Sequence, residues 1–359
     1  MTRLERLRER MAATGTDLVA VAPGAHLHWL LGFAPHPDER VCLLLVSPDM
    51  AGFVMPALNA QDARQHTDLP FWEWADDNGP DAALAAALSK INTKPRSISL
   101  DETMRADHAL LLLDAAPDAK RDYAAVTVGA LRMLKDADEL AALQHNADIA
   151  DAAQNALRAA VHDGITELEL SDVAKASFEA QGARMAFGIV GTGAHSSYPH
   201  HHTADTPIRS GDVIVVDIGG EKNGYFSDIT RMICLGDKPG GYQEVHDTVE
   251  AAVAAALAAI KPGVKAREID KAARDIIIAE GYGDYFTHRT GHGLGLEVHE
   301  PPYITSTNDQ VLEEGMVFTV EPGIYLPGKF GVRLEEVAVV TENGCRILSK
   351  LSRDLHSCF

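Results

Sequence analysis

Four acidic residues lie in stretches that otherwise have the composition of buried strands. Asp217 interrupts the apolar run VIVVDI, and Asp228 directly precedes the run ITRMICL. Glu321 and Glu335 stand within or at the end of strand-like runs in VFTVEPGIYL and GVRLEEVAVV. A lone buried carboxylate is so costly that it either takes up a proton or is paired with a cation. The four acids therefore predict a cation-binding site.

The segment VIVVDIGGEKNGYFSDITRMICL has the pattern of a hairpin with glycine-rich turn signals in its middle. We expect its centre between Lys222 and Asn223, which would place Asp217 directly opposite Asp228. Opposed residues have Cβ atoms about 5 Å apart, and like charges at that distance destabilise a sheet. A different register, with both side chains in solvent, is the alternative.

A fifth candidate ligand comes from residues 289–302, RTGHGLGLEVHEPP, where histidines stand among glycines and prolines. Glycine allows close backbone approach and positive φ, so this stretch is expected to be built around a ligand, although a surface loop with incidental histidines is the alternative for GHG alone. His292 is the glycine-flanked histidine. Two divalent cations balance four carboxylates, whereas one does not. Oxygen ligands with one imidazole suit manganese, our first choice, and also cobalt or zinc.

The composition restricts the class of protein. With 359 residues and about 150 residues per domain, the chain is expected to form two globular domains. The net charge of −20 disfavours nucleic acid and anionic lipid as partners. No apolar run approaches the roughly 18 residues of a membrane helix. Four cysteines without CxxC spacing predict neither a disulfide framework nor a thiolate zinc site, and favour the cytoplasm.

The pattern of elements changes near residue 125. Before it, short β-rich runs and helical stretches alternate as in a small α/β domain. After it, Asp136 and Glu139 have the spacing of a capping box before a long amphipathic helix. We therefore expect domains at 1–125 and 126–359. In the second domain, strands are predicted at 213–218 and 229–235 and in the two C-terminal runs, and helices at 245–260 and about 267–280.

The five candidate ligands, in this order, resemble the signature of the pita-bread metallopeptidases: Asp217, Asp228, His292, Glu321 and Glu335. The strings YFSDITR, HRTGHGLGLEVHEPP, TVEPGIY and GVRLEE are similar to those of the branch that contains aminopeptidase P and the Xaa-Pro dipeptidases (prolidases). The resemblance implies an α/β (α+β) protein. It would have a small creatinase-type N-terminal domain, which gates the substrate and contributes to a homodimer, and a C-terminal pita-bread catalytic domain with two divalent ions per chain.

The resemblance also implies roles for individual side chains. Glu321 would accept a proton from the attacking water while it binds metal. His200, in SYPHHHTAD, and His299, in HEPP, would hold the substrate and stabilise the oxyanion, whereas His201 and His202 are taken as bystanders. Arg333 is expected to orient a carboxylate or the substrate.

The implied reaction is hydrolysis of the peptide bond before proline in short Xaa-Pro peptides. A dipeptidase must bind the free carboxylate of the C-terminal proline, usually through a basic group. Some prolidases carry an arginine just after the HExP motif, but here Tyr303 stands there and no Lys or Arg lies between 300 and 310. Arg333, a histidine or Arg40 would have to take this task. An Xaa-Pro aminopeptidase acting on longer peptides, and a peptide-binding module without catalysis, are the alternatives.

Overall fold

The computed structural model describes residues 1–91 and 94–359, which form two compact units, Met1–Arg132 and Met133–Phe359. The division falls after α6 (Val128–Arg132), later than the predicted boundary at 125. Helix α6 packs on α1 (Arg3–Thr14) and α2 (Ala25–Leu31), and the guanidinium of Arg132 donates a hydrogen bond to Nδ1 of His26 at 3.1 Å. These tertiary contacts attach α6 to the first unit, and a sequence pattern cannot reveal them.

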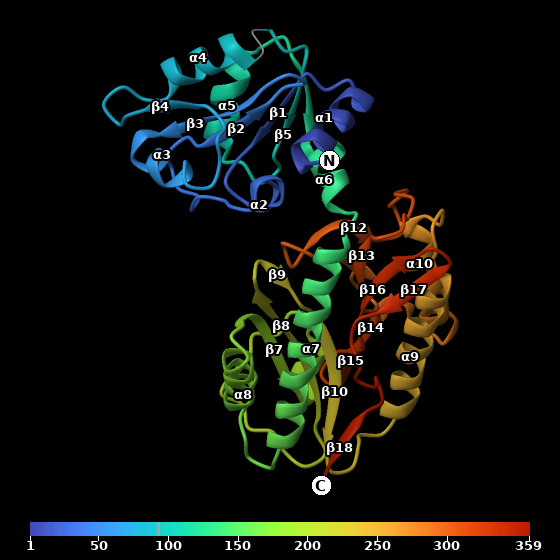
Figure 1. Ribbon diagram of the computed structural model, residues 1–359. Coiled ribbons are helices and arrows are strands. Elements are labelled where there is room, and N and C mark those ends of the chain that lie inside the picture. Colours follow the sequence, from blue (N-terminus) through green and yellow to red (C-terminus); the bar gives the residue numbers. More distant parts are fainter. Residues whose placement is uncertain (92–93) are drawn as a thin grey trace. The chain divides into compact units, whose positions relative to one another are not determined.

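The first unit is built on a six-stranded sheet with strand order β4-β3-β2-β1-β5-β6 (Figure 1). Its strands are β1 (Leu18–Val21), β2 (Leu43–Val46), β3 (Ala51–Pro56), β4 (Phe71–Trp74), β5 (Ser97–Leu100) and β6 (Lys120–Tyr123). The other helices of this unit are α3 (Ala57–Ala63), α4 (Asp81–Ile91) and α5 (Ala106–Ala115). Strands β1, β2 and β3 are buried along their whole length, so the core of the small α/β unit lies around them.

The second unit contains two five-stranded sheets and a two-stranded ribbon. The first sheet is formed by β7 (Arg184–Thr192), β8 (Val213–Lys222), β9 (Tyr225–Phe226), β10 (Ile229–Leu235) and β18 (His356–Cys358). The second sheet is formed by β11 (Gly291–Gly293), β12 (Glu300–Ile304), β13 (Val317–Val320), β16 (Glu336–Thr341) and β17 (Gly344–Ile347). The ribbon pairs β14 (Gly323–Leu326) with β15 (Phe330–Arg333).

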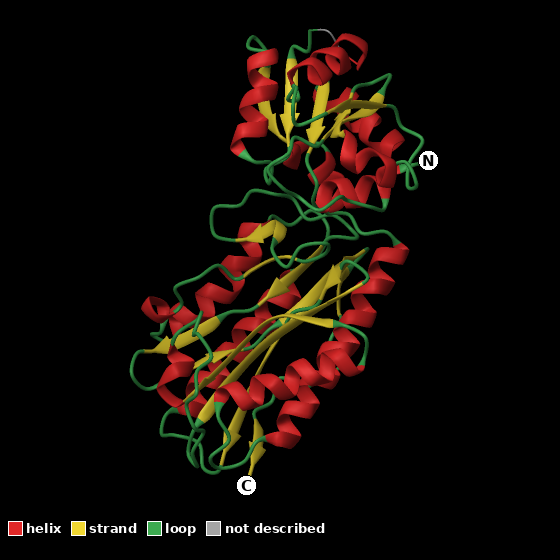
Figure 2. Cartoon of the chain, turned by 90° about the vertical axis from the view of Figure 1, so that its left-hand side faces the viewer, coloured by secondary structure: helices red, strands yellow, loops and turns green. Residues whose placement is uncertain are grey.

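Four long helices line the sheets of the second unit, as Figure 2 shows in red against the yellow strands. They are α7 (Ala137–Ala160), α8 (Glu167–Ala180), α9 (Tyr242–Ala259) and α10 (Ala266–Ala279). Helices α7 and α8 pack on the first sheet, whereas α9 and α10 pack on each other and contact the second sheet. The predicted capping box is confirmed, because Asp136 and Glu139 cap α7 reciprocally.

The hairpin of β8 and β10 is confirmed, but its predicted register is wrong. Asn223 and Gly224 have φ values of 57° and 83°, as the two central residues of a type I′ turn require. The centre therefore lies between these two residues, and Asp217 pairs with Thr230 instead of Asp228. Asp228 precedes Thr230 by two positions, so both aspartates lie on the same face as diagonal neighbours.

The two C-terminal runs were predicted as one strand each, and each run forms two strands. The first breaks at Glu321 and Pro322, between β13 and β14, and the second breaks at Leu334 and Glu335, between β15 and β16. Proline lacks the N–H that a ladder needs, so the pairing cannot continue unchanged through this point. Val320 pairs with Glu336 and Gly323 pairs with Arg333, a register that puts Glu321 across from Glu335.

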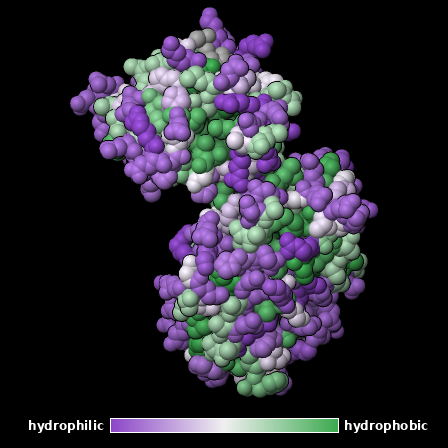
Figure 3. Space-filling model, viewed as in Figure 1, coloured by the Kyte–Doolittle hydropathy of each residue, from purple (hydrophilic) through white to green (hydrophobic). Residues whose placement is uncertain are grey.

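The face of the molecule in Figure 3 is mainly hydrophilic, with dispersed apolar areas. The large apolar side chains that are exposed stand on separate elements, for example Leu58 on α3, Leu110 on α5 and Leu168 on α8. In the two described ranges, no helix is both long and apolar enough to pass through a bilayer.

Candidate functional site

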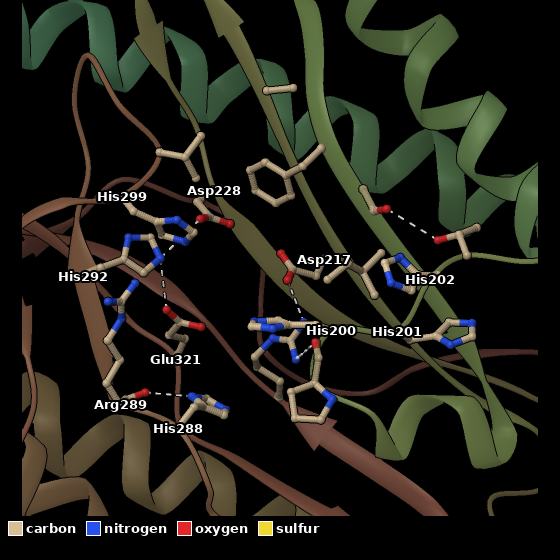
Figure 4. A pocket seen from close by; sticks show the side chains of 18 residues that line it. His200, His201, His202, Asp217, Asp228, His288, Arg289, His292, His299 and Glu321 are labelled. Carbon is tan, nitrogen blue, oxygen red and sulfur yellow. Dashed lines mark hydrogen bonds and ion pairs between the residues drawn. The ribbon is translucent and has the colours of Figure 1, made fainter. Parts of the chain in front are cut away.

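The second unit contains a cavity of about 1070 Å³, shown from close by in Figure 4. Its lining includes most residues that the sequence singled out: His200, Asp217, Asp228, His292, His299, Glu321 and Arg333. Glu335 is also close, because its carboxylate and the ligand atoms of Asp228 and His292 all lie within 4.8 Å of one another. The fold thus brings the five candidate metal ligands, His200, His299 and Arg333 to one place from two sheets and the ribbon. Arg40 does not line this cavity and pairs with Asp76 and Glu39 in the first unit.

His292 presents an unprotonated nitrogen to two carboxylates. Its Nδ1 lies 3.1 Å from the carbonyl oxygen of Gly293, so this nitrogen carries the proton and donates the hydrogen bond. In the neutral ring, Nε2 is therefore an acceptor. It lies 3.1 Å from a carboxylate oxygen of Glu321 and 3.7 Å from one of Asp228. Three acceptors that converge in this way require a cation between them.

The glycines beside His292 are explained by close strand packing. A Cβ on Gly291 would collide with the carbonyl of Thr319 on β13, and a Cβ on Gly293 would collide with backbone of β12. Neither glycine has a positive φ, in contrast to one reason that the sequence suggested for them. The tight packing also lets the Thr319 hydroxyl accept from the backbone N–H of His292 (3.0 Å) and donate to the carboxylate of Glu321 (3.0 Å), which fixes the backbone of His292 relative to the Glu321 side chain.

Asp217 is held by Arg333, which is buried with 3% of its surface exposed. One Oδ of Asp217 accepts a hydrogen bond of 2.6 Å from Arg333. The same guanidinium donates to the Tyr325 hydroxyl (2.9 Å), the Thr230 hydroxyl (3.2 Å) and the carbonyl of Pro199 (3.3 Å). Arg333 is therefore fixed among internal partners, and it orients Asp217.

Two carboxylate oxygens at the centre of the cluster have no hydrogen-bond partner. Glu335 uses one oxygen to accept from the Thr230 hydroxyl at 2.8 Å, but its Oε1 is buried and unsatisfied. Oδ1 of Asp217 is buried and unsatisfied in the same way. Buried acceptors without partners are rare, and each calls for a missing ion or water. The donor set fits divalent metal ions that prefer oxygen ligands with one imidazole.

The pKa values of the acids indicate a local shortage of positive charge. Burial raises the pKa of Asp228 well above its usual range, and Glu335 and Asp217 raise it further. Burial, then Glu321 and Asp217, raises the pKa of Glu335 in the same way. Two of the acids thus resist ionisation unless a further cation is present.

The other predicted histidines also face the cavity. His299 packs its ring against that of His292, with centroids 4.2 Å apart and an interplanar angle of 83°. Burial, followed by the charges of His292 and Arg289, lowers the pKa of His299 to about 4, so this ring is neutral at pH 7. His200 lies beside Asp217 in Figure 4.

His201 is not the bystander that the sequence suggested. Its Nε2 donates to the buried carboxylate of Glu167 at 2.8 Å, and Nδ1 of His195 donates to the other oxygen at 2.9 Å. The two rings stack with centroids 4.4 Å apart. His202 lines the cavity as well. Glu167 thereby anchors the segment that carries His200.

Sequence reasoning missed several residues of the cavity wall. Nδ1 of His288 donates to the carbonyl of Arg289 at 2.7 Å, so in the neutral ring Nε2 accepts from the Tyr325 hydroxyl at 2.8 Å. Burial lowers the pKa of His288. Arg289 lines the cavity next to it. Their position in HRTGHG, just before the glycine-flanked His292, was the available signal, because residues next to a ligand strand share its approach to the cavity.

Comparison with known proteins is consistent with these features. Residues 141–342 match the model of metallopeptidase family M24, and residues 3–134 match the Creatinase/Prolidase N-terminal domain. A probable dipeptidase of Mycobacterium tuberculosis is 36% identical over 360 residues, covering 98% of this chain and 95% of that protein. An Xaa-Pro dipeptidase of Pyrococcus furiosus is 33% identical, covering 98% and 99% of the two chains. A dipeptidase structure from Pyrococcus horikoshii is 35% identical with a TM-score of 0.92, covering 99% and 100%.

Proposed function

The chain belongs to metallopeptidase family M24, and on that premise we propose that it is an Xaa-Pro dipeptidase that works with two divalent metal ions per chain. The observation that carries the proposal is the convergence of three acceptor atoms, Nε2 of His292 and one oxygen each of Glu321 and Asp228. The unsatisfied oxygens of Asp217 and Glu335 support the same reading. These five residues would hold the two ions.

When bound, the ions would polarise the scissile carbonyl and lower the pKa of the attacking water. Glu321 accepts the proton of that water and passes it to the leaving nitrogen of proline. This proton is essential, because the nitrogen leaves as an amine only when it is protonated as the C–N bond breaks. His200 and His299 donate hydrogen bonds to the oxygen of the scissile carbonyl, and the neutral state of His299 at pH 7 suits a donor of this kind.

Arg333, Tyr325 and Thr319 form hydrogen bonds that orient the metal ligands. Arg333, which also donates to Tyr325, occupies one oxygen of Asp217 and leaves the unsatisfied Oδ1 for a metal ion. Thr319 sets the relative position of His292 and Glu321. Groups that support metal ligands in this way fix the geometry that hydrolysis needs.

The proposal is tested by the hydrolysis of Ala-Pro and Ala-Pro-Ala by the full chain in the presence of manganese. We expect release of alanine from both peptides to be metal-dependent and faster from Ala-Pro. Faster turnover of Ala-Pro-Ala would favour an aminopeptidase that acts on longer peptides. No hydrolysis of either peptide by protein with two bound ions would favour a peptide-binding module.

Other parts of the proposal rest on more general arguments. Manganese is our first choice because four of the five donors are carboxylates, and cobalt and zinc remain the alternatives. Cys42, Cys234, Cys345 and Cys358 are all free thiols, which supports a cytoplasmic location. We also propose that the first unit gates the substrate and contributes to a homodimer. Gel filtration with light scattering would test the oligomeric state.

A further inference from the structure

A dipeptidase has to bind a carboxylate close to the bond that it cleaves. In Xaa-Pro, the carboxylate belongs to the residue directly after the scissile bond, and its carbon is only two bonds from the scissile nitrogen. A cationic side chain in the wall of the same cavity is the natural partner for this group. Two arginines line the cavity, Arg289 and Arg333.

Arg333 is committed to other partners. A guanidinium has five N–H donors, and Arg333 uses four of them on Asp217, Tyr325, Thr230 and the carbonyl of Pro199. It is also buried, with 3% of its surface exposed. One N–H remains, so the two parallel hydrogen bonds that a carboxylate prefers would require Arg333 to give up one of these partners. The geometry therefore argues against the substrate-binding role that the sequence suggested for Arg333.

Arg289 differs from Arg333 in its contacts. Among the described residues, none forms an ion pair or a hydrogen bond with its guanidinium. The side chain is half-buried, and in Figure 4 it lies beside His292 and Glu321 at the cavity wall. Its charge is close enough to His299 to contribute to the lowered pKa of that ring. Arg289 is therefore a cation within the site that has donors left for a ligand.

The guanidinium of Arg289 is nevertheless held in place. Its central carbon lies 4.7 Å from the centroid of the Tyr303 ring, the geometry of a cation–π contact. The backbones on which the two residues stand are paired, because Thr290 donates its N–H to the carbonyl of Ile304 at 2.9 Å. The ring contact takes no hydrogen bond from the guanidinium, so the N–H donors remain for a ligand.

We propose that Arg289, supported by the ring of Tyr303, binds the C-terminal carboxylate of the dipeptide and so restricts the enzyme to substrates that end one residue after the scissile bond. This inference rests on the proposed function. The fork of N–H donors matches a carboxylate, and the pair would be partly shielded from water in the cavity. A peptide that continues beyond proline has no charge at this point.

The test compares Ala-Pro with Ala-Pro amide, which lacks the negative charge. Arg289→Met keeps the length of the side chain and removes its charge. We expect kcat/KM for Ala-Pro to fall by about 10- to 150-fold, the range for a hydrogen bond to a charged group, and the value for the amide to change less than about 3-fold. Arg289→Lys should recover part of the loss on Ala-Pro, because it restores the charge without the fork.

Two further measurements make the result decisive. Competitive inhibition by L-proline reports on the carboxylate contact without any turnover, and the inhibition constant should rise in Arg289→Met by a factor similar to the loss on Ala-Pro. Arg346→Met is the matched control, because Arg346 is exposed on β17, bonds Gln144 and does not line the cavity. It should behave as wild type in all assays. Metal content should be unchanged in all three variants.

The outcomes separate this inference from the proposed function. If the wild-type protein with two bound ions does not cleave Ala-Pro, the proposed function fails first. If it does cleave Ala-Pro, equal losses on the acid and the amide in Arg289→Met would overturn the inference. Wild-type inhibition by L-proline in this variant would overturn it as well, even where turnover of the amide is too slow to measure.

Discussion

Glu335→Gln should stabilise the protein without metal and destabilise it with metal. In chelator, the substitution removes one of four crowded negative charges and keeps an oxygen that can accept from Thr230. The ligand atoms of Glu335 and Asp228 lie within 4.8 Å of each other. At that separation, two full charges repel by about 3.5 kcal/mol with an effective dielectric constant of about 20.

The expected gain is smaller than this full repulsion. The raised pKa values of Asp228 and Glu335 mean that the wild-type protein already relieves part of the repulsion by binding protons. We therefore expect Glu335→Gln to raise the free energy of unfolding in chelator by about 1 to 2 kcal/mol. With excess manganese the sign should reverse, because a ligand present at 100 times its Kd contributes about 2.7 kcal/mol that the variant would lose.

The assay has to report on the unfolding of the second unit, which contains the site. All three tryptophans, Trp29, Trp72 and Trp74, lie in the first unit, so tryptophan fluorescence does not report on the site. Urea unfolding followed by far-UV circular dichroism includes the helices of the second unit, and fluorescence recorded in parallel serves as an internal control. The fluorescence transition should not move with the substitution.

Glu336→Gln is the matched control for this experiment. Glu336 is the next residue and is equally buried, but it pairs with Arg231 at 2.9 Å and with Arg353 at 3.0 Å. Its loss leaves Arg231 in the interior without its carboxylate partner, which should cost about 3 kcal/mol with or without metal. If Glu335→Gln lowered the free energy of unfolding in chelator, as Glu336→Gln should, the idea that the four acids repel one another until a cation binds would be refuted.

Three further outcomes follow from the structure. His299→Ala should retain both metal ions and lose about 100-fold or more in kcat/KM, whereas His292→Ala should lose metal; equal metal loss in the two variants would contradict this division. Glu167→Gln should lower the free energy of unfolding by about 3 kcal/mol and reduce kcat by displacing the segment of His200, and an unchanged urea midpoint would argue against the anchor. Burial raises the pKa of Cys42 to about 12, so iodoacetamide at pH 8 should modify this thiol only in unfolded protein, as mass spectrometry of peptides can check.

Much of the second unit could be predicted because its signals are local. The capping box at Asp136, the apolar runs of β8 and β10, and the helix that ends before Lys261 each depend on neighbouring residues. The wrong hairpin register also came from a local choice, namely which two residues form the turn. Asn-Gly is the preferred central pair of a type I′ turn, so a centre at Asn223-Gly224 could have been chosen from the sequence.

The partners of the site residues could not be predicted in this way. Thr230 meets Glu335, and Arg333 meets Asp217, across more than 100 positions of the chain. The sequence identified Glu321 and Glu335 as acids in or at the ends of strands, but only the strand pairing reveals that they lie across from each other. Such contacts depend on how two sheets and a ribbon are assembled, and the hydrophobic periodicity of the sequence does not predict this assembly.

The two arginines of the cavity wall change the net charge that was expected from the four acids alone. The acids alone were expected to be balanced by two divalent ions, but Arg333 and Arg289 add two positive charges to the cavity wall. Without metal, the pocket then carries an excess of at most two negative charges, and fewer where Asp228 and Glu335 bind protons. In a protein whose net charge is −20, it offers no net positive charge to the carboxylate of a dipeptide. With two divalent ions the excess becomes positive. Binding of L-proline should therefore depend on metal, and calorimetric titration of L-proline into chelator-treated and metal-loaded protein would reveal equal affinities if this argument were wrong.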